Sequence, residues 1–332
     1  MATTTATDQK TGSRKLSLSS FVPVATKTLM ALHDVYVSAD IYLLHEGAPQ
    51  PTLFRSRSVR STAENFRSLV DVDVLYVKRS EYGNFQSAIA AHLETILQRE
   101  NIPAAWRLSA LQAAMECEVD TTLRLIQCDH LVNQSQKMGY HISTLLRDSR
   151  TLPADLFQVL RHDYYTFTHM TNVSSYAVLL AEGLGIADQR ELEEIAVGGL
   201  LHDVGKRLIS PRILNKPKKL SDDEFETIKT HPQIGYEELQ GRNDISRDQL
   251  MMVYQHHERI DGTGYPVRIM GDEMHLWSRL CAVVDVFDAM TCERPYRKPL
   301  GVGHVLSFMQ QKAGSHLDKE MVRCWTKLMS AK

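Results

Sequence analysis

Cysteine is scarce in this sequence, and its spacing is irregular. Five cysteines occur among 332 residues, and no two of them form a CxxC pair. This pattern argues against a thiolate zinc site and against a disulfide scaffold, and it favours reduced thiols in a cytoplasmic protein. No apolar run approaches the ~20 residues that a membrane helix needs, so we expect no membrane association. Residues 1–20 are polar and lack the apolar stretch of a secretion signal, and we interpret them as a disordered tail.

The chain also lacks a strong excess of charge of either sign. Its formal net charge at pH 7 is -2, which gives no global reason to expect binding to a nucleic acid polymer. A few local lysines and arginines can still hold a small anionic ligand. The apolar share of 43% and the charged share of 23% are ordinary for a globular protein, and the length allows two domains.

The first structured region, residues 21–85, has the pattern of a small α+β domain. Strands are predicted at Val35–Val37, Ile41–Leu44 and Val72–Val77, which are rich in β-branched and aromatic residues. A helix start is predicted at Ser61–Glu64, where a serine is followed three residues later by a glutamate. The region has no catalytic constellation, so it is either a structural module or a ligand-sensing or docking unit with a regulatory role.

The remainder is predicted to be helical. Residues 86–150 form a helical linker in which apolar positions step by three or four residues, at Leu108, Leu111, Met115, Val119, Thr122 and Ile126. Such a stripe is either packed core or a homodimer seam. Residues 151–332 form a second, all-helical domain that holds the dense chemistry. The predicted fold is therefore mainly α, with a smaller N-terminal α+β domain joined to the second domain by long helices.

A histidine and an aspartate end one apolar helix of this domain. His202 and Asp203 follow the segment Ile195–Leu201, and Gly205 fits the left-handed position that terminates helices. Buried polar groups of this kind are costly unless they are paired or bound to a metal. Imidazole and carboxylate together form a ligand set suited to iron, manganese, zinc and related ions.

More histidines and an acid share this chemistry. His256 and His257 are adjacent near the end of another helix. Neighbouring helical residues point about 100° apart, so these two imidazoles can bracket a metal cluster. The sharp loop of residues 260–266 then leaves Tyr265 exposed, to reach a ligand or to pack the loop. The candidate ligands outside the first pair are His169, His231, which opens a helix, His256, His257 and Asp285, an acid within an apolar helix.

Several separated motifs together resemble one family. HDVGK, HPQIG, HHERIDGTGYP and DVFDAM, in that order, closely resemble the HD-GYP family, as do ILNKPKKLSDDEF and RPYRK. The resemblance covers the chain from about Asp163 to the C-terminus. It implies an HD-GYP catalytic domain that hydrolyses cyclic di-GMP to the linear dinucleotide pGpG, to GMP or to both, by metal-activated hydroxide, in bacterial second-messenger signalling.

The resemblance also implies a site and its cofactors. Two divalent ions, iron or manganese, would share Asp203 as a bridge. We expect two ions because Tyr165 stands where some members carry a glutamate for a third. Carried over position by position, the metal ligands are His169, His202, Asp203, His231, His256, His257 and Asp285.

Substrate contacts follow from the same resemblance. Lys206 would contact the scissile phosphate, and Gly264 and Tyr265 of the GYP loop would border the site. This loop would also dock GGDEF-type signalling proteins. Phosphate or guanine would be bound by Arg294 and by Arg297 or Lys298.

Two alternatives remain open at this stage. The site can be a catalytically slow cyclic di-GMP sensor or a protein-docking module. It can also be a phosphohydrolase that acts on another cyclic dinucleotide, because contacts specific for guanine do not follow from spacing.

Overall fold

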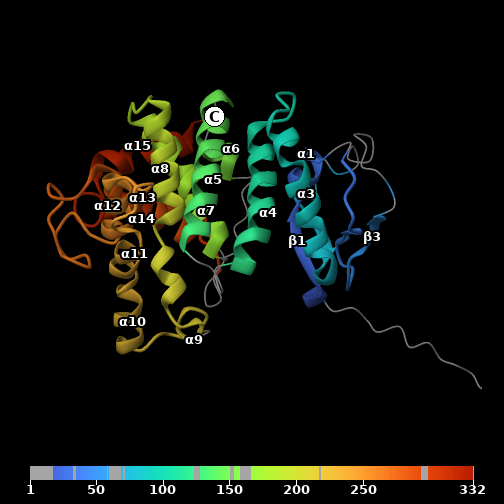
Figure 1. Ribbon diagram of the computed structural model, residues 1–332. Helices are drawn as coiled ribbons and strands as arrows, with labels where there is room; N and C mark the ends of the chain where they lie inside the picture. The colour runs from blue at the N-terminus through green and yellow to red at the C-terminus, as the bar shows by residue number, and fades with distance from the viewer. Residues whose placement is uncertain are drawn as a thin grey trace, which may run out of the picture.

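The computed structural model describes residues 18–32, 35–57, 59, 69, 72–122, 128–149, 153–157, 166–216, 218–292 and 298–331. A small sheet lies at one end of the molecule and a helical domain at the other, with two long helices between them (Figure 1). The predicted fold class, mainly α with a smaller N-terminal α+β unit, is confirmed.

The N-terminal unit is an antiparallel sheet with the strand order β1-β4-β2-β3. Its strands are β1 (Phe21–Ala25), β2 (Ile41–Leu43), β3 (Thr52–Arg55) and β4 (Val74–Lys78). Helices α1 (Thr26–Ala31) and α3 (Tyr82–Leu97) pack against it (Figure 1). The core of this unit includes Leu29, Leu75, Val77, Phe85 and Ile89, which are completely buried.

Two of the three predicted strands are confirmed and one is wrong. Those at residues 41–44 and 72–77 correspond to β2 and β4. The strand predicted at Val35–Val37 is wrong, because these residues form an irregular segment. Val35 and Val37 are nevertheless buried. The alternating apolar pattern therefore indicated that the segment is buried, although the segment does not pair with a neighbouring strand. The helix start predicted at Ser61–Glu64 lies outside the described residues.

Two long helices, α4 (Ala104–Thr122) and α5 (Cys128–Ser149), connect the sheet to the helical domain. Helix α4 contacts α1 and α3 on one side and α5 and α7 on the other. Leu108 and Leu111 of the predicted stripe are completely buried, so this part of the stripe packs within the chain. The side chains of the stripe beyond residue 114 lie outside the described residues.

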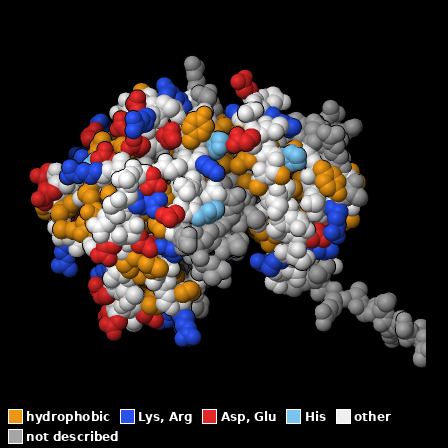
Figure 2. Space-filling model, viewed as in Figure 1, with side chains coloured by type: hydrophobic (Ala, Val, Ile, Leu, Met, Phe, Trp, Pro, Cys, Tyr) orange, Lys and Arg blue, Asp and Glu red, His pale blue; other side chains and the backbone are white. Residues whose placement is uncertain are grey.

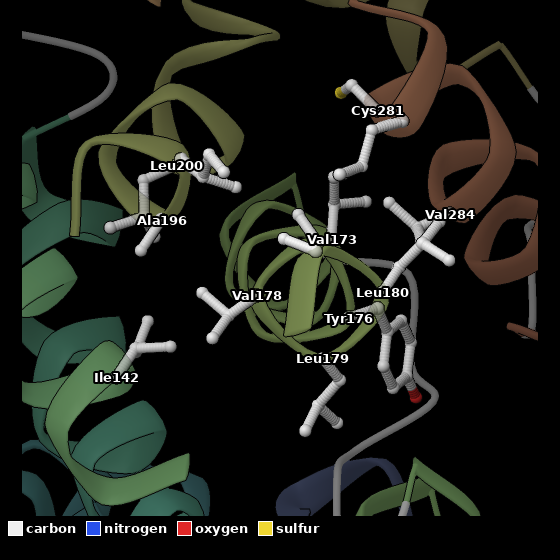
Figure 3. Packing of buried hydrophobic residues seen from close by; sticks show 14 of the residues in the cluster. Ile142, Val173, Tyr176, Val178, Leu179, Leu180, Ala196, Leu200, Cys281 and Val284 are labelled. Atoms are coloured by element: carbon white, nitrogen blue, oxygen red, sulfur yellow. The ribbon is translucent and has the colours of Figure 1, made fainter. Parts of the chain in front are cut away.

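Helix α7 (Thr166–Gly183) occupies the centre of the helical domain. It is buried around its whole circumference, as shown by Val173, Tyr176, Val178 and Leu180, which is the pattern of a core helix. Its neighbours are α5, α8 (Gln189–Leu201) and α13 (Leu276–Thr291). Figure 3 shows side chains from all three around it, namely Ile142, Ala196, Leu200, Cys281 and Val284.

Shorter elements complete the domain. Helix α6 (Pro153–Phe157) precedes α7, and α14 (Val302–Lys312) and α15 (Lys319–Ser330) follow α13. Between α8 and α13 the chain forms η4 (Val204–Leu208), α9 (Pro211–Leu214), α10 (Asp222–Lys229), α11 (His231–Leu239) and α12 (Arg247–Gln255). The capping box predicted at Ser221 and Glu224 opens α10 as expected.

The surface agrees with the balanced composition. Acidic and basic side chains are interspersed over the described part of the face in Figure 2. Among the described helices, none combines the length and the apolar character that crossing a bilayer requires.

Candidate metal centre

Asp203 lies where the ends of several helices meet. It lies between His202, which caps the end of α8, and η4, and it is almost completely buried. Its Oδ1 lies 3.1 Å from His231 Nε2 and 3.7 Å from His256 Nε2. Its Oδ2 lies 3.4 Å from His202 Nε2 and 3.6 Å from His169 Nε2. Each oxygen of one carboxylate therefore faces a different pair of imidazoles.

These side chains form two groups that could each hold a metal ion. One group consists of Asp203, His231, His256 and His257, and the other consists of His169, His202 and Asp203. Within each group the ligand atoms lie within 4.8 Å of one another. Asp203 belongs to both groups, so a single carboxylate is shared between them.

Three of the imidazoles are oriented by the same local device. The Nδ1 atoms of His202, His231 and His256 lie 2.7 to 2.8 Å from the backbone carbonyl oxygens three residues earlier. Since a carbonyl only accepts, each Nδ1 carries a proton, and in the neutral ring the lone pair on Nε2 faces Asp203. Such hydrogen bonds are typical of metal-binding histidines. A helix end supplies the free carbonyl each time.

Carboxylates orient the fourth imidazole, His169 of α7. Its Nδ1 lies 2.7 Å from Asp288 Oδ2, and its Nε2 lies 3.1 Å from Asp285 Oδ1. Burial alone would lower the pKa of His169, but the hydrogen bonds to Asp285 and Asp288 outweigh it and raise the pKa to about 10. The two acids therefore favour a positive charge at this point, supplied by a proton or by a metal ion.

The other ionisable groups suit a cation as well. Burial acts to raise the pKa of Asp203, but Lys206 and the imidazoles of His202 and His231 hold it well below its usual range. Burial lowers the pKa of His256 to about 4, and burial together with neighbouring imidazoles lowers that of His257 well below its usual value. A carboxylate that stays ionised close to His256 and His257, which stay neutral, belongs to a competent metal ligand set. His202 Nε2 is also a buried nitrogen with no hydrogen-bond partner among the described residues, which a bound ion would satisfy.

Lys206 and Gly205 lie beside the carboxylate. Lys206 Nζ is 2.5 Å from Asp203 Oδ2 and remains partly exposed. Gly205 does not adopt the left-handed conformation that we predicted. A Cβ at this position would instead lie 2.0 Å from the carbonyl oxygen of His231. The glycine is required by the close approach of η4 to the start of α11, which brings His231 to Asp203.

The loop after α12 closes over His257. The ring of Tyr265 stacks on that of His257, with centroids 4.8 Å apart and an interplanar angle of 30°. Tyr265 is half-buried rather than exposed as expected, because the imidazole covers one face of its ring. Gly264 is buried, and a Cβ on it would lie 2.4 Å from the Cα of Glu258.

Two residues that sequence reasoning missed support this arrangement. One is Asp288, the partner of His169. The other is Glu258, whose buried carboxylate accepts hydrogen bonds from the backbone nitrogens of Val267 and Arg268 at 2.6 and 2.9 Å. Asp288 lies three residues after Asp285 on the same helix face, a signal that the sequence did contain.

The sequence profile of the HD domain family matches residues 127–321, more than half of the chain. The chain belongs to the HD domain family. The match begins before α5, so it takes in part of the segment that we predicted to be a linker. The proposed domain boundaries stay a prediction.

Named relatives support the HD-GYP resemblance, which is confirmed. The HD domain chain is 36% identical over 185 residues to the Pseudomonas aeruginosa cyclic di-GMP phosphodiesterase PA4108, covering 56% of this chain and 44% of that protein. It is 36% identical over 177 residues to the Xanthomonas campestris cyclic di-GMP phosphodiesterase response regulator RpfG, covering 53% and 47%. It is also 36% identical to a 3′3′-cGAMP-specific phosphodiesterase of Vibrio cholerae, covering 50% and 35%. The chain thus spans about half the length of these relatives or less.

One solved structure resembles nearly the whole chain. Bd1817, described as an HDG"Y"P protein from Bdellovibrio bacteriovorus, superposes with a TM-score of 0.66 at 16% identity, covering 94% of this chain and 100% of that chain. At this identity the likeness shows the fold alone. It includes most of the N-terminal unit as well as the HD domain.

The structure brings together most of the predicted site residues of the HD domain. Asp203, the six other predicted metal ligands and Lys206 lie in one cluster, and Gly264 and Tyr265 form part of the adjacent loop. Lys298 is exposed, and its contact with substrate stays a prediction. Arg294, Arg297 and Tyr165 lie outside the described residues.

Proposed function

We propose that this HD domain protein is a metal-dependent phosphodiesterase that hydrolyses cyclic di-GMP. The observation that carries the proposal is the position of Asp203, whose two oxygens face two groups of imidazoles while Lys206 lies at its edge. A shared carboxylate of this kind is typical of two-metal hydrolytic sites. The curated relatives named as phosphodiesterases add support.

The residues divide naturally between two ions, which we propose to be iron or manganese. His169, His202, Asp203 and Asp285 would hold one, and Asp203, His231, His256 and His257 would hold the other. Bound ions of this type polarise phosphoryl oxygens and lower the pKa of coordinated water. The expectation of two ions rather than three rests on Tyr165.

The protein's own side chains would contribute orientation and charge. The Lys206 ammonium would lie against a non-bridging phosphoryl oxygen and neutralise the charge that develops there. Asp288 would keep the proton on His169 Nδ1, so that Nε2 stays available. Tyr265, fixed against His257, would form a wall of the substrate pocket. Arg294, together with Arg297 or Lys298, would bind phosphate or guanine.

The choice of cyclic dinucleotide is the finer part of the proposal. Cyclic di-GMP is favoured because two relatives at 36% identity carry it in their names. 3′3′-cGAMP is the second candidate, because a relative of the same identity is named for it. The product would be pGpG, GMP or both.

The setting follows from the resemblance as well. We propose action in the cytoplasm within second-messenger signalling. The loop that contains Gly264 and Tyr265 would dock GGDEF-type proteins, and the protein would form a homodimer. The N-terminal sheet unit would have a regulatory role.

Purification without oxygen, metal quantification and product analysis together test the proposal. The protein is incubated in parallel with cyclic di-GMP and with 3′3′-cGAMP, with iron or manganese supplied. Two equivalents of metal and faster hydrolysis of cyclic di-GMP are expected. Preference for 3′3′-cGAMP would reassign the substrate, and tight binding without turnover would identify a sensor. Absence of bound metal would overturn the proposal.

A further inference from the structure

Gln112 is a buried amide that belongs to the connection between the two units. It lies on α4, before the segment that matches the HD domain family. Its side chain is completely buried, and its Nε2 donates a hydrogen bond to Asn172 Oδ1 at 3.1 Å. Because burying an amide nitrogen is unfavourable unless it donates a hydrogen bond, this contact links α4 to α7 at a defined position.

The hydrogen bond continues toward the metal centre. Asn172 Nδ2 donates to Asp288 Oδ1 at 2.9 Å, and Asp288 Oδ2 accepts from His169 Nδ1 at 2.7 Å. Asn172, Asp288 and His169 are all essentially buried. Four side chains from three helices thus form one continuous hydrogen-bonded chain that ends on a candidate metal ligand.

The chain has a single consistent direction. The Asp288 carboxylate accepts from both of its neighbours, so the amide nitrogen of Asn172 must face it. The amide oxygen of Asn172 then faces Gln112 and needs a donor. Gln112 Nε2 supplies that donor, and it keeps Asn172 from turning its oxygen toward Asp288, where the two acceptors would repel.

We propose that Gln112 is a positioning residue for the metal centre. It acts through Asn172 and Asp288 to hold the His169 imidazole with Nε2 toward Asp203 and Asp285. This inference rests on the proposed function, because it takes His169 to be a metal ligand. It assigns to the N-terminal part of the chain, outside the family match, a role in orienting a candidate ligand of the site.

Gln112→Met tests this role, since methionine has a similar length and volume but cannot donate to Asn172. Metal-free protein is titrated with Mn²⁺ against a chelating dye, and thermal unfolding is followed in parallel. Supporting residues of this kind alter binding by about twofold to thirtyfold, and we expect a loss of Mn²⁺ affinity in that range. Unchanged affinity would overturn the inference.

Ser109→Ala is the matched control. Ser109 lies three residues earlier on α4, is buried, and makes a hydrogen bond of 2.5 Å with Thr28 Oγ1 in α1. Its loss should lower the melting temperature and leave Mn²⁺ affinity unchanged. If Ser109→Ala weakens Mn²⁺ binding as much as Gln112→Met does, the effect is general loosening of α4 and the inference is wrong.

A double-mutant cycle checks the route. In an Asn172→Ala background, Gln112→Met should cause no further loss of Mn²⁺ affinity, whereas an additive loss would contradict action through Asn172. Should Gln112→Met fail to fold, Gln112→Asn, which keeps the amide but shortens its reach, is measured with the same expectation. Wild-type protein that binds no Mn²⁺ would overturn the proposed function, whereas equal binding by wild type and Gln112→Met overturns the positioning role alone.

Discussion

Lys206 Nζ lies 2.5 Å from Asp203 Oδ2, although the same carboxylate is also surrounded by four imidazoles. Asp203 caps the start of the short helix η4, and Lys206 lies within this helix three residues later. Asp203 is buried whereas Lys206 is partly exposed, so the ammonium forms the boundary between the ligand cluster and solvent. A phosphate that approaches the cluster from solvent would meet this ammonium.

Lys206→Ala should therefore lose turnover while retaining metal. Removal of one electrostatic contact to a developing charge typically lowers the rate by ~10²–10³, and we expect kcat for the cyclic dinucleotide to fall by that factor. Lys327→Ala, which removes an exposed lysine of α15, should hydrolyse at the normal rate. Normal turnover by Lys206→Ala would show that the ammonium has no part in the reaction.

Asp203→Asn keeps the shape of the side chain and removes its charge. Because Asp203 belongs to both groups of candidate ligands, this single change should reduce the content of both ions, with complete loss of activity. Elemental analysis of the purified variant measures the effect. Asp272→Asn, which changes an exposed aspartate of the same domain, should keep the full metal content. A variant at position 203 with unchanged metal would rule out the bridging role.

Part of the geometry of the predicted ligands is set by residues close to them in the sequence. His202, His231 and His256 each occupy a helix end, where the carbonyl three residues earlier is free to accept from Nδ1. That device depends on residues close in sequence, and it is therefore accessible from the sequence.

Contacts between segments that are distant in the sequence could not be predicted in this way. The bond between Gln112 and Asn172 joins residues 60 positions apart, and neither residue type signals a partner. Glu258 lies within a recognised motif, but nothing local tells that its carboxylate turns toward the backbone of Val267. At Val35–Val37 the alternation reported burial correctly, whereas strand pairing depends on a neighbouring segment that the pattern does not specify.

Gly205→Ala should disturb the site through the backbone. The added Cβ would lie 2.0 Å from the carbonyl oxygen of His231 and 2.7 Å from the nitrogen of Gly235, so η4 and α11 must separate. Overpacking typically costs about 1–3 kcal/mol, and we expect a loss of unfolding free energy of that size together with weaker metal binding. Chemical denaturation and metal titration measure the two effects.

Gly303→Ala provides the control for that change. Gly303 lies in α14, and a Cβ there would meet nothing within 4 Å. Since alanine favours a helix over glycine by up to ~1 kcal/mol, this variant should be as stable as the wild type or more so. If both variants behave alike, the close approach at Gly205 does not constrain the fold.

Glu258→Gln should loosen the loop that carries Tyr265. The buried Glu258 carboxylate accepts from Val267 N through Oε1 and from Arg268 N through both oxygens, and Arg268 has a positive φ of 68°. A glutamine keeps one acceptor oxygen and turns a donor toward the second contact, so the cost of a buried unsatisfied group, about 1–3 kcal/mol, should appear as local opening.

Hydrogen exchange at the Val267 and Arg268 amides measures this opening without reference to activity. Exchange in Glu258→Gln should accelerate by roughly tenfold, since 1.4 kcal/mol corresponds to a factor of ten, and the KM for substrate should rise because the ring of Tyr265 is less well fixed against His257. Glu273→Gln is the matched change in the same loop, where an exposed carboxylate accepts from Met270 N at 3.0 Å. Water replaces that contact readily, so its exchange and KM should stay close to wild type. Equal protection in Glu258→Gln and wild type would mean that the loop is held by its other contacts, including the stacking of Tyr265 on His257.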